Sequence, residues 1–103
     1  MGKAQRDKGY RGEYNLVKHL KAEGFDAKRI PLSGATAFQK GDVKIEEFIA
    51  EVKVRKNGFK QLYRWLEDPD VDLLFIKADY MPYLVVMPLD VFELFLKELI
   101  KHD

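Results

Sequence analysis

The chain has 103 residues, of which 47% are hydrophobic and 34% charged, with a formal net charge of +1. These values are typical of one globular domain, so we expect a single domain over residues 1–103. The chain has no cysteine, which excludes disulfides and thiolate metal sites and leaves oxygen ligands for hard ions such as Mg²⁺ or Mn²⁺. No apolar run approaches the ~20 residues of a membrane span, and the sequence predicts a cytoplasmic protein without a membrane partner.

The small net charge is the sum of a basic N-terminal part and an acidic C-terminal part of the chain. Residues 1–60 hold 14 Lys and Arg against 8 Asp and Glu, a net charge of +6. Residues 61–103 hold 4 against 9, a net charge of −5. A basic half is what a surface that binds a polyanion requires, although small domains also show such asymmetry for other reasons.

The first periodic segment predicts a helix over residues 4–24, with Gly24 as its stop signal. Tyr10, Tyr14, Val17 and Leu20 recur at helical spacing and form its apolar stripe. On a helical wheel Glu13 lies only about 20° from Leu20. We therefore expect the Glu13 carboxylate to point inward with that stripe.

Residues 26–54 are predicted to form extended segments joined by a loop and a turn. An extended piece over residues 26–30 is followed by a loop over residues 31–41, which is rich in Gly, Ser, Thr and Pro. Strands are then predicted over residues 42–45 and 48–54, with a tight turn between them at Glu46 and Glu47.

The last third predicts a helix over residues 59–67, strands over residues 71–77 and 83–87, and a final helix that begins at Asp90 as N-cap. Residues 71–77 are apolar enough for the middle of a sheet that is covered on both faces. The resulting order, α-β-β-β-α-β-β-α, predicts an α/β sandwich with a mixed central sheet flanked by helices.

Charged residues interrupt the apolar strand predicted over residues 48–54. Its two-residue period sends Ile49, Glu51 and Lys53 to one face, so the two charges share a side of the sheet. An exposed edge strand would place charges in the same way. The spacing of this pair alone therefore does not identify a site.

Asp42 adds a second carboxylate. It starts the preceding strand, so a hairpin would bring it beside Glu51. Two converging carboxylates repel each other unless a cation or a shared proton neutralises them, and Mg²⁺ is commonly held by one or two carboxylates. Lys53, on the same face, would orient an attacking hydroxide or stabilise charge on a phosphate. This combination is typical of a metal-dependent phosphodiesterase.

The pattern "GD…EVK", with Asp42, Glu51 and Lys53, resembles the PD-(D/E)XK nuclease superfamily. The resemblance implies a restriction-endonuclease-like fold, with Asp42 and Glu51 as metal ligands and Lys53 as the catalytic lysine. Gly41 stands where the superfamily name has proline. Within the superfamily, the stretch "KGYRGEYNLVKHLKAEGFDAKRIPLSG" is similar to archaeal-type Holliday-junction resolvases and their phage relatives.

That closer resemblance covers roughly residues 8–55 and implies further roles. Glu13 would be an additional active-site acid and metal ligand, Arg29 a basic residue near the site, and Ser33 a loop residue that contacts the junction. The family usually has Arg directly after the helix acid, where this chain has Tyr14, and Arg11 is the substitute that the sequence offers. A phage or viral member would act in the host cytoplasm.

Basic residues cluster around the elements that carry the acids, which favours contact with phosphate groups. The predicted DNA-binding residues are Lys8, Arg11, Arg29, Ser33, Arg55 and Lys56. The two histidines, His19 and His102, are not assigned to a metal.

We expect a Mg²⁺-dependent DNA endonuclease, with Mn²⁺ as a substitute, acting as a homodimer that introduces paired nicks in a four-way junction. Two alternatives remain open at this point. One is a nuclease of replication-repair or restriction type, because Gln61 resembles a helix-borne Gln in other branches of the superfamily. The other is a DNA-binding module of the same fold without turnover.

Overall fold

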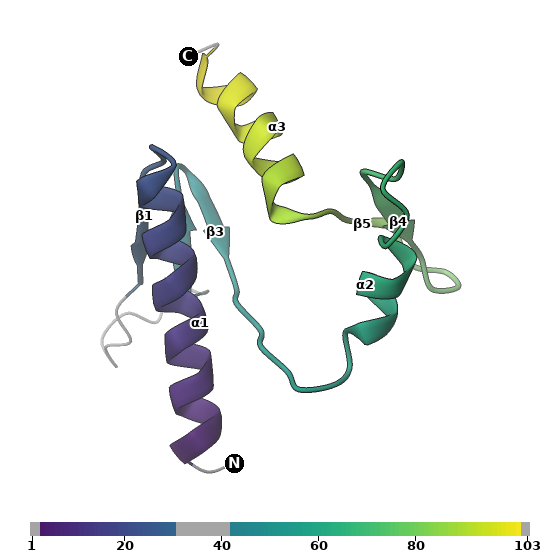
Figure 1. The fold of residues 1–103 in the computed structure, drawn as a ribbon, viewed down its shortest axis with the longest axis horizontal. Helices are drawn as coiled ribbons and strands as arrows, with labels where there is room; N and C mark the ends of the chain where they lie inside the picture. The colour runs from purple at the N-terminus through teal and green to yellow at the C-terminus, as the bar shows by residue number, and fades with distance from the viewer. Residues whose placement is uncertain (1–2, 31–41, 102–103) are drawn as a thin grey trace. The chain divides into compact units, whose positions relative to one another are not determined.

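The computed structural model describes residues 3–30 and 42–101 and is of mixed α/β class (Figure 1). The predicted loop over residues 31–41, which includes Ser33, lies outside the described residues. The chain divides into two compact units, an N-terminal unit over Met1–Arg55 and a C-terminal unit over Lys56–Asp103.

The N-terminal unit packs one helix on a small antiparallel sheet. Helix α1 (Lys3–Ala22) is followed by β1 (Ala27–Arg29), β2 (Val43–Ile45) and β3 (Phe48–Ala50), and the strands lie in the order β1-β2-β3. Figure 1 shows α1 running beside this sheet. The helix stops where Gly24 adopts a φ of 94°, which suits glycine because it lacks a Cβ. The predicted end at Gly24 is confirmed.

The core of this unit comes from one face of α1 and one face of the sheet. Its buried apolar side chains are Val17, Leu20, Phe25, Ala27, Ile30, Val43 and Ile45. Tyr10 and Tyr14, predicted on the same stripe of the helix, are instead about half exposed. Both lie nearer the start of α1, and the Tyr10 ring contacts the Arg29 guanidinium, 4.2 Å from the ring centroid.

The turn between β2 and β3 falls at Glu46 and Glu47, as predicted. Glu46 has a φ of 53°, a conformation that a residue with a side chain adopts at some energetic cost. Two hydrogen bonds to Asp26 hold it there. Glu46 N donates to Asp26 O at 2.7 Å, and Asp26 N donates to Glu46 Oε2 at 2.8 Å.

Strand β3 ends at Ala50, four residues before the end of the predicted strand. The reason is a contact between residues ten positions apart, because the Val52 N–H donates to the Asp42 carboxylate and not to a neighbouring strand. Side-chain acceptors of this kind compete with the backbone ladder.

The C-terminal unit contains α2 (Lys60–Trp65), β4 (Leu74–Ile76), β5 (Leu84–Val86) and α3 (Leu89–Lys101). Strands β4 and β5 form a separate two-stranded antiparallel sheet. The described residues therefore form two antiparallel sheets, which differs from the single mixed sheet expected. Phe75 of β4 is 62% exposed, so the apolar run at residues 71–77 does not form a strand covered on both faces.

Helix α3 begins at Leu89, two residues earlier than an N-cap at Asp90 predicts. Pro88 O accepts hydrogen bonds from Val91 N and Phe92 N, so the first turn is closed by a backbone carbonyl. Asp90 lies within that turn, and its Oδ1 accepts from Val91 N. The assignment of Asp90 as N-cap was wrong, because the proline already sets the start of the helix.

Candidate active site

Asp42 is held by hydrogen bonds to both neighbouring segments of the sheet. Its N–H donates to Ala50 O at 2.8 Å, and its carbonyl accepts from Ile30 N at 2.9 Å. Its side-chain Oδ2 accepts from Val52 N at 2.8 Å. The other carboxylate oxygen, Oδ1, receives no hydrogen bond from the described residues. Hydrogen bonds thus hold both the backbone and one carboxylate oxygen of Asp42 in place.

Hydrogen bonds on either side of Glu51 hold this residue next to Asp42. Both of its chain neighbours, Ala50 and Val52, are hydrogen-bonded to Asp42. The Glu51 side chain is 61% exposed, and its Oε2 lies 3.6 Å from Lys53 Nζ. The structure therefore keeps Asp42, Glu51 and Lys53 in one small part of the N-terminal unit.

The alternation predicted for this segment is present. Ile49, Glu51 and Lys53 are exposed, whereas Ala50, Val52 and Val54 are partly buried. The buried side contacts α1 at Gly12, where a Cβ would lie 2.6 Å from Val54 Cγ2. A side chain at position 12 would push the helix away, so glycine permits this close approach. Glu51 and Lys53 consequently lie on the face directed away from α1.

Glu13 lies on the α1 side of the sheet. Its Oε1 accepts a hydrogen bond from Arg29 Nε at 3.1 Å, and the Glu13 side chain is only 16% exposed. The expected inward direction of Glu13 is present. Its partner is the guanidinium of β1, which also stacks on Tyr10.

The acids do not converge into a three-carboxylate site. Among residues 3–30 and 42–101 no group of three or more His, Asp or Glu side chains is placed to hold a metal ion. Asp42 and Glu51 nevertheless offer oxygen donors from adjacent positions, and a Mg²⁺ ion commonly uses only one or two carboxylates, completed by water and phosphate. The residues present fit a two-carboxylate site better than one that includes Glu13.

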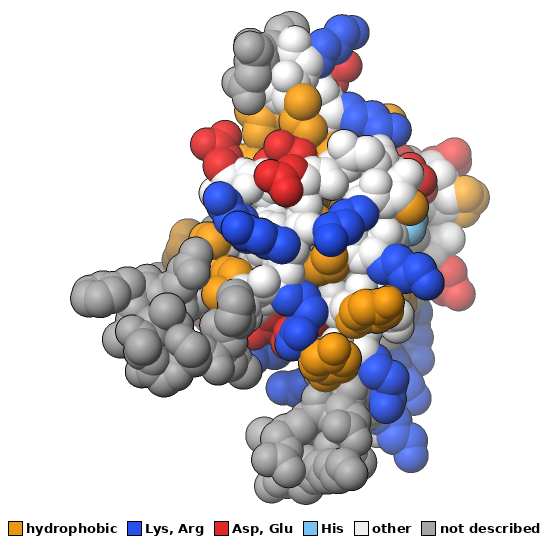
Figure 2. Space-filling model, turned by 90° about the vertical axis from the view of Figure 1, so that its left-hand side faces the viewer, with side chains coloured by type: hydrophobic (Ala, Val, Ile, Leu, Met, Phe, Trp, Pro, Cys, Tyr) orange, Lys and Arg blue, Asp and Glu red, His pale blue; other side chains and the backbone are white. Residues whose placement is uncertain are grey.

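The predicted DNA-binding residues are distributed over the described chain. Lys8 and Arg11 belong to α1, and Arg11 is exposed. Arg55 and Lys56 are also exposed and stand on either side of the boundary between the two units. Figure 2 shows Lys and Arg side chains at many separate places on the visible surface.

Sequence reasoning missed the role of Gly12. A glycine inside a helical pattern costs about 1 kcal/mol relative to alanine, so its presence is a signal of close packing. It also missed the Asp42–Val52 hydrogen bond. The sequence places Asp42 at the start of a strand. It does not identify the N–H group from which the Asp42 carboxylate accepts a hydrogen bond.

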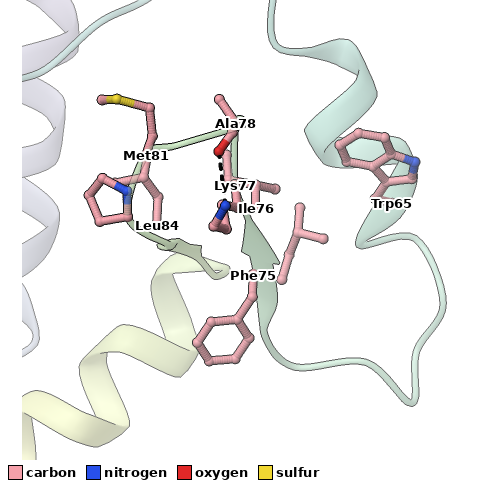
Figure 3. A pocket seen from close by; sticks show the side chains of 9 residues that line it. Trp65, Phe75, Ile76, Lys77, Ala78, Met81 and Leu84 are labelled. Carbon is pink, nitrogen blue, oxygen red and sulfur yellow. Dashed lines mark hydrogen bonds between the residues drawn. The ribbon is translucent and has the colours of Figure 1, made fainter.

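The C-terminal unit contains an open apolar groove, bordered by Trp65, Phe75, Met81 and Leu84 (Figure 3). Its one charged lining residue is Lys77, whose Nζ donates to Ala78 O at 3.3 Å. No acid lines this groove. General acid, general base or metal chemistry therefore has no carboxylate to use there, and the candidate site remains in the N-terminal unit.

No helix in the described part of the chain is long and apolar enough to cross a membrane. Comparisons of the sequence with protein-family models and curated proteins, and of the structure with solved structures, found no match.

Proposed function

We propose that the chain is a Mg²⁺-dependent DNA endonuclease that hydrolyses phosphodiester bonds, with Mn²⁺ as a substitute ion. The preferred substrate is a four-way junction, cut by paired nicks from a homodimer, since a two-fold substrate suits a two-fold enzyme. The observation that carries the proposal is the attachment of Asp42 to both neighbours of Glu51, with Lys53 Nζ 3.6 Å from the Glu51 carboxylate.

Asp42 and Glu51 would hold the metal ion. When bound, such an ion would activate a water molecule and polarise an oxygen of the scissile phosphate. The Asp42 carboxylate is already oriented by the Val52 N–H, so little rearrangement is needed for its Oδ1 to act as a ligand. The exposed Glu51 side chain is accessible to a large substrate.

Lys53 supplies the positive charge. Its ammonium group would stabilise the negative charge that develops on the phosphate during attack. In the free protein this charge is balanced by Glu51. Since the pair is largely exposed, water screens it, and the lysine can move to a phosphate with little loss.

Glu13 is proposed to act as a positioning residue. Its ion pair with Arg29 fixes a guanidinium at the end of β1, opposite Val43, the residue that follows Asp42. This arrangement favours an indirect contribution over direct metal binding. The restriction-endonuclease-like fold belongs to the same proposal and is supported by the helix packed on an antiparallel β1-β2-β3 sheet.

The test is a cleavage assay with an end-labelled four-way junction, a matched duplex and a single strand, each with Mg²⁺, Mn²⁺ or EDTA. Wild type is compared with Glu51→Gln and Lys53→Ala, and with Lys97→Ala as an exposed-lysine control on α3. We expect symmetric junction cuts that EDTA abolishes and that both site variants lose by at least about 100-fold. Wild-type rates in Glu51→Gln would contradict the assignment.

The comparison of the three DNA substrates tests which DNA structure the protein prefers to cut. Equal cutting of duplex or single strand would keep the nuclease and exclude the resolvase. A DNA-binding module without turnover is a second candidate, favoured by the lack of a three-acid group among the described residues. Junction binding on a native gel, with no cleavage under any metal condition, would establish it.

A further inference from the structure

Two lysines lie directly opposite each other on the sheet of the N-terminal unit. The register pairs Lys28 of β1 with Lys44 of β2, and Lys44 in turn with Ile49 of β3. Side chains of directly opposed residues lie on the same face of a sheet. Lys28, Lys44 and Ile49 therefore form one row across the three strands, called here the lysine row.

The lysine row lies on the face directed away from α1. Arg29, the neighbour of Lys28, contacts Glu13 and Tyr10 of the helix, so strand alternation turns Lys28 to the other side. Ile49 is half exposed and shares its side with Glu51 and Lys53. The lysine row and the proposed catalytic pair therefore share one face of the sheet, on which Lys28 is exposed and Lys44 partly exposed.

The direct opposition of Lys28 and Lys44 destabilises the sheet. Like charges at directly opposed positions destabilise a pair of strands. No described carboxylate forms an ion pair with Lys28 or Lys44, and the third member of the row is apolar. Glu46, close to Lys44 in sequence, instead accepts a hydrogen bond from the Asp26 N–H. The repulsion would be relieved by an anion on this face.

We propose that the lysine row binds the phosphate backbone of DNA beside the scissile bond. The proposal rests on the nuclease function above. Adjacent strands lie about 4.8 Å apart, so two ammonium groups extend from neighbouring positions toward the same stretch of polyanion. A backbone held there lies on the same face as Glu51 and Lys53. The contact recognises phosphates and carries no sequence preference.

The test measures binding of a labelled junction and a labelled duplex by fluorescence anisotropy in EDTA over a series of salt concentrations. The variants are Lys28→Gln, Lys44→Gln and the double substitution, with Lys97→Gln as the control on α3. Each lost phosphate contact reduces the slope of log affinity against log salt by about 0.9 on duplex DNA. We expect reduced slopes for both row variants, an additive loss in the double, and an unchanged slope in the control.

A second measurement separates DNA binding from a structural role. Lys44→Glu places an acid opposite Lys28, so we expect a higher melting temperature together with weaker DNA binding. A purely structural residue would not move these two quantities in opposite directions. In cleavage assays with Mg²⁺ the double Gln variant should raise KM several-fold and leave kcat unchanged.

The outcomes distinguish this inference from the proposed function. Wild-type cleavage with unchanged salt slopes in the variants would overturn the lysine row alone. Reduced slopes without any cleavage by the wild type would support phosphate binding by the lysine row and exclude the nuclease function. A wild type that neither binds nor cuts DNA would overturn both.

Discussion

The two units of the chain differ in how they bury apolar surface. The N-terminal unit contains seven of the eight buried hydrophobic residues among those described, and the C-terminal unit contains only Leu96. Exposed aromatic and aliphatic side chains are concentrated in the C-terminal unit, where Tyr63, Phe75 and Tyr83 are each more than 60% exposed. Buried and exposed apolar side chains are thus separated along the sequence.

Charge follows the same division. Residues 1–55 hold 12 Lys and Arg against 8 Asp and Glu, a net charge of +4, whereas residues 56–103 hold 6 against 9, a net charge of −3. The unit with the better core is also the one suited to a polyanion. A three-stranded sheet covered by a helix is stable where an isolated two-stranded hairpin is marginal. The proposed chemistry therefore lies on the unit with the larger sheet and the larger number of buried apolar side chains.

The largest expected effect contrasts the two units directly. Leu20→Ala removes a fully buried side chain and should cost about 3 kcal/mol of unfolding free energy. Phe75→Ala, at a position 62% exposed, should cost less than about 1 kcal/mol. Urea denaturation followed by circular dichroism measures both. Equal losses would show that the exposed face of β4 is buried in solution.

A smaller effect probes the contact of α1 with residues 52–54. Gly12→Ala should reduce stability by a net of about 1 to 2 kcal/mol, although alanine favours a helix, because its Cβ would lie 2.6 Å from Val54 Cγ2. Adding Val54→Ala should recover part of the loss in a double-mutant cycle. If Gly12→Ala alone were stabilising, α1 would not be in close contact there.

The next prediction separates the two tasks of Asp42. Asp42→Ala leaves the Val52 N–H without its acceptor and should cost about 1 kcal/mol. Asp42→Asn retains a carbonyl oxygen for that bond and should melt close to the wild type. Both variants should lose metal-dependent cleavage. Full cleavage by Asp42→Asn would show that the carboxylate charge is not needed.

The smallest expected effect concerns the ring beneath Arg29. Tyr10→Leu should reduce stability by about 0.5 kcal/mol, because it removes a cation–π contact at a half-exposed site. Tyr14→Leu is the matched control, since Tyr14 is equally exposed. Thermal unfolding of the two variants compares them. Identical melting temperatures would mean that the stacking contributes nothing measurable.

The sequence predicted features that depend on neighbouring residues. The end of α1 at Gly24 and the turn at Glu46 and Glu47 follow from local backbone preferences and from the change of period on either side. The alternation of Glu51 and Lys53 with Val52 and Val54 follows from the geometry of extended chain. For the candidate site, this was enough to place Asp42, Glu51 and Lys53 in one region.

Features set by contacts distant in sequence were not predictable. The Glu13–Arg29 ion pair joins residues 16 positions apart, and a helical wheel gives the direction of Glu13 without naming its partner. The early end of β3 depends on which N–H the Asp42 carboxylate reaches. The apolar pattern of residues 71–77 indicates a strand but does not determine how many strands lie beside it.

The Glu46 turn has a consequence for how insertions and deletions would act on this chain. The turn sets the pairing of Ile45 with Phe48. Because residues alternate between the two faces of a strand, this pairing determines the face on which every later residue of the hairpin lies. One residue added between Ile45 and Phe48 would exchange the two faces downstream if the turn kept two residues and the register shifted by one. Glu51 and Lys53 would then turn toward the helix and Val52 toward water. A residue that is instead taken up by a longer loop or a bulge would preserve the two faces, so single insertions should be tolerated only where the loop itself lengthens.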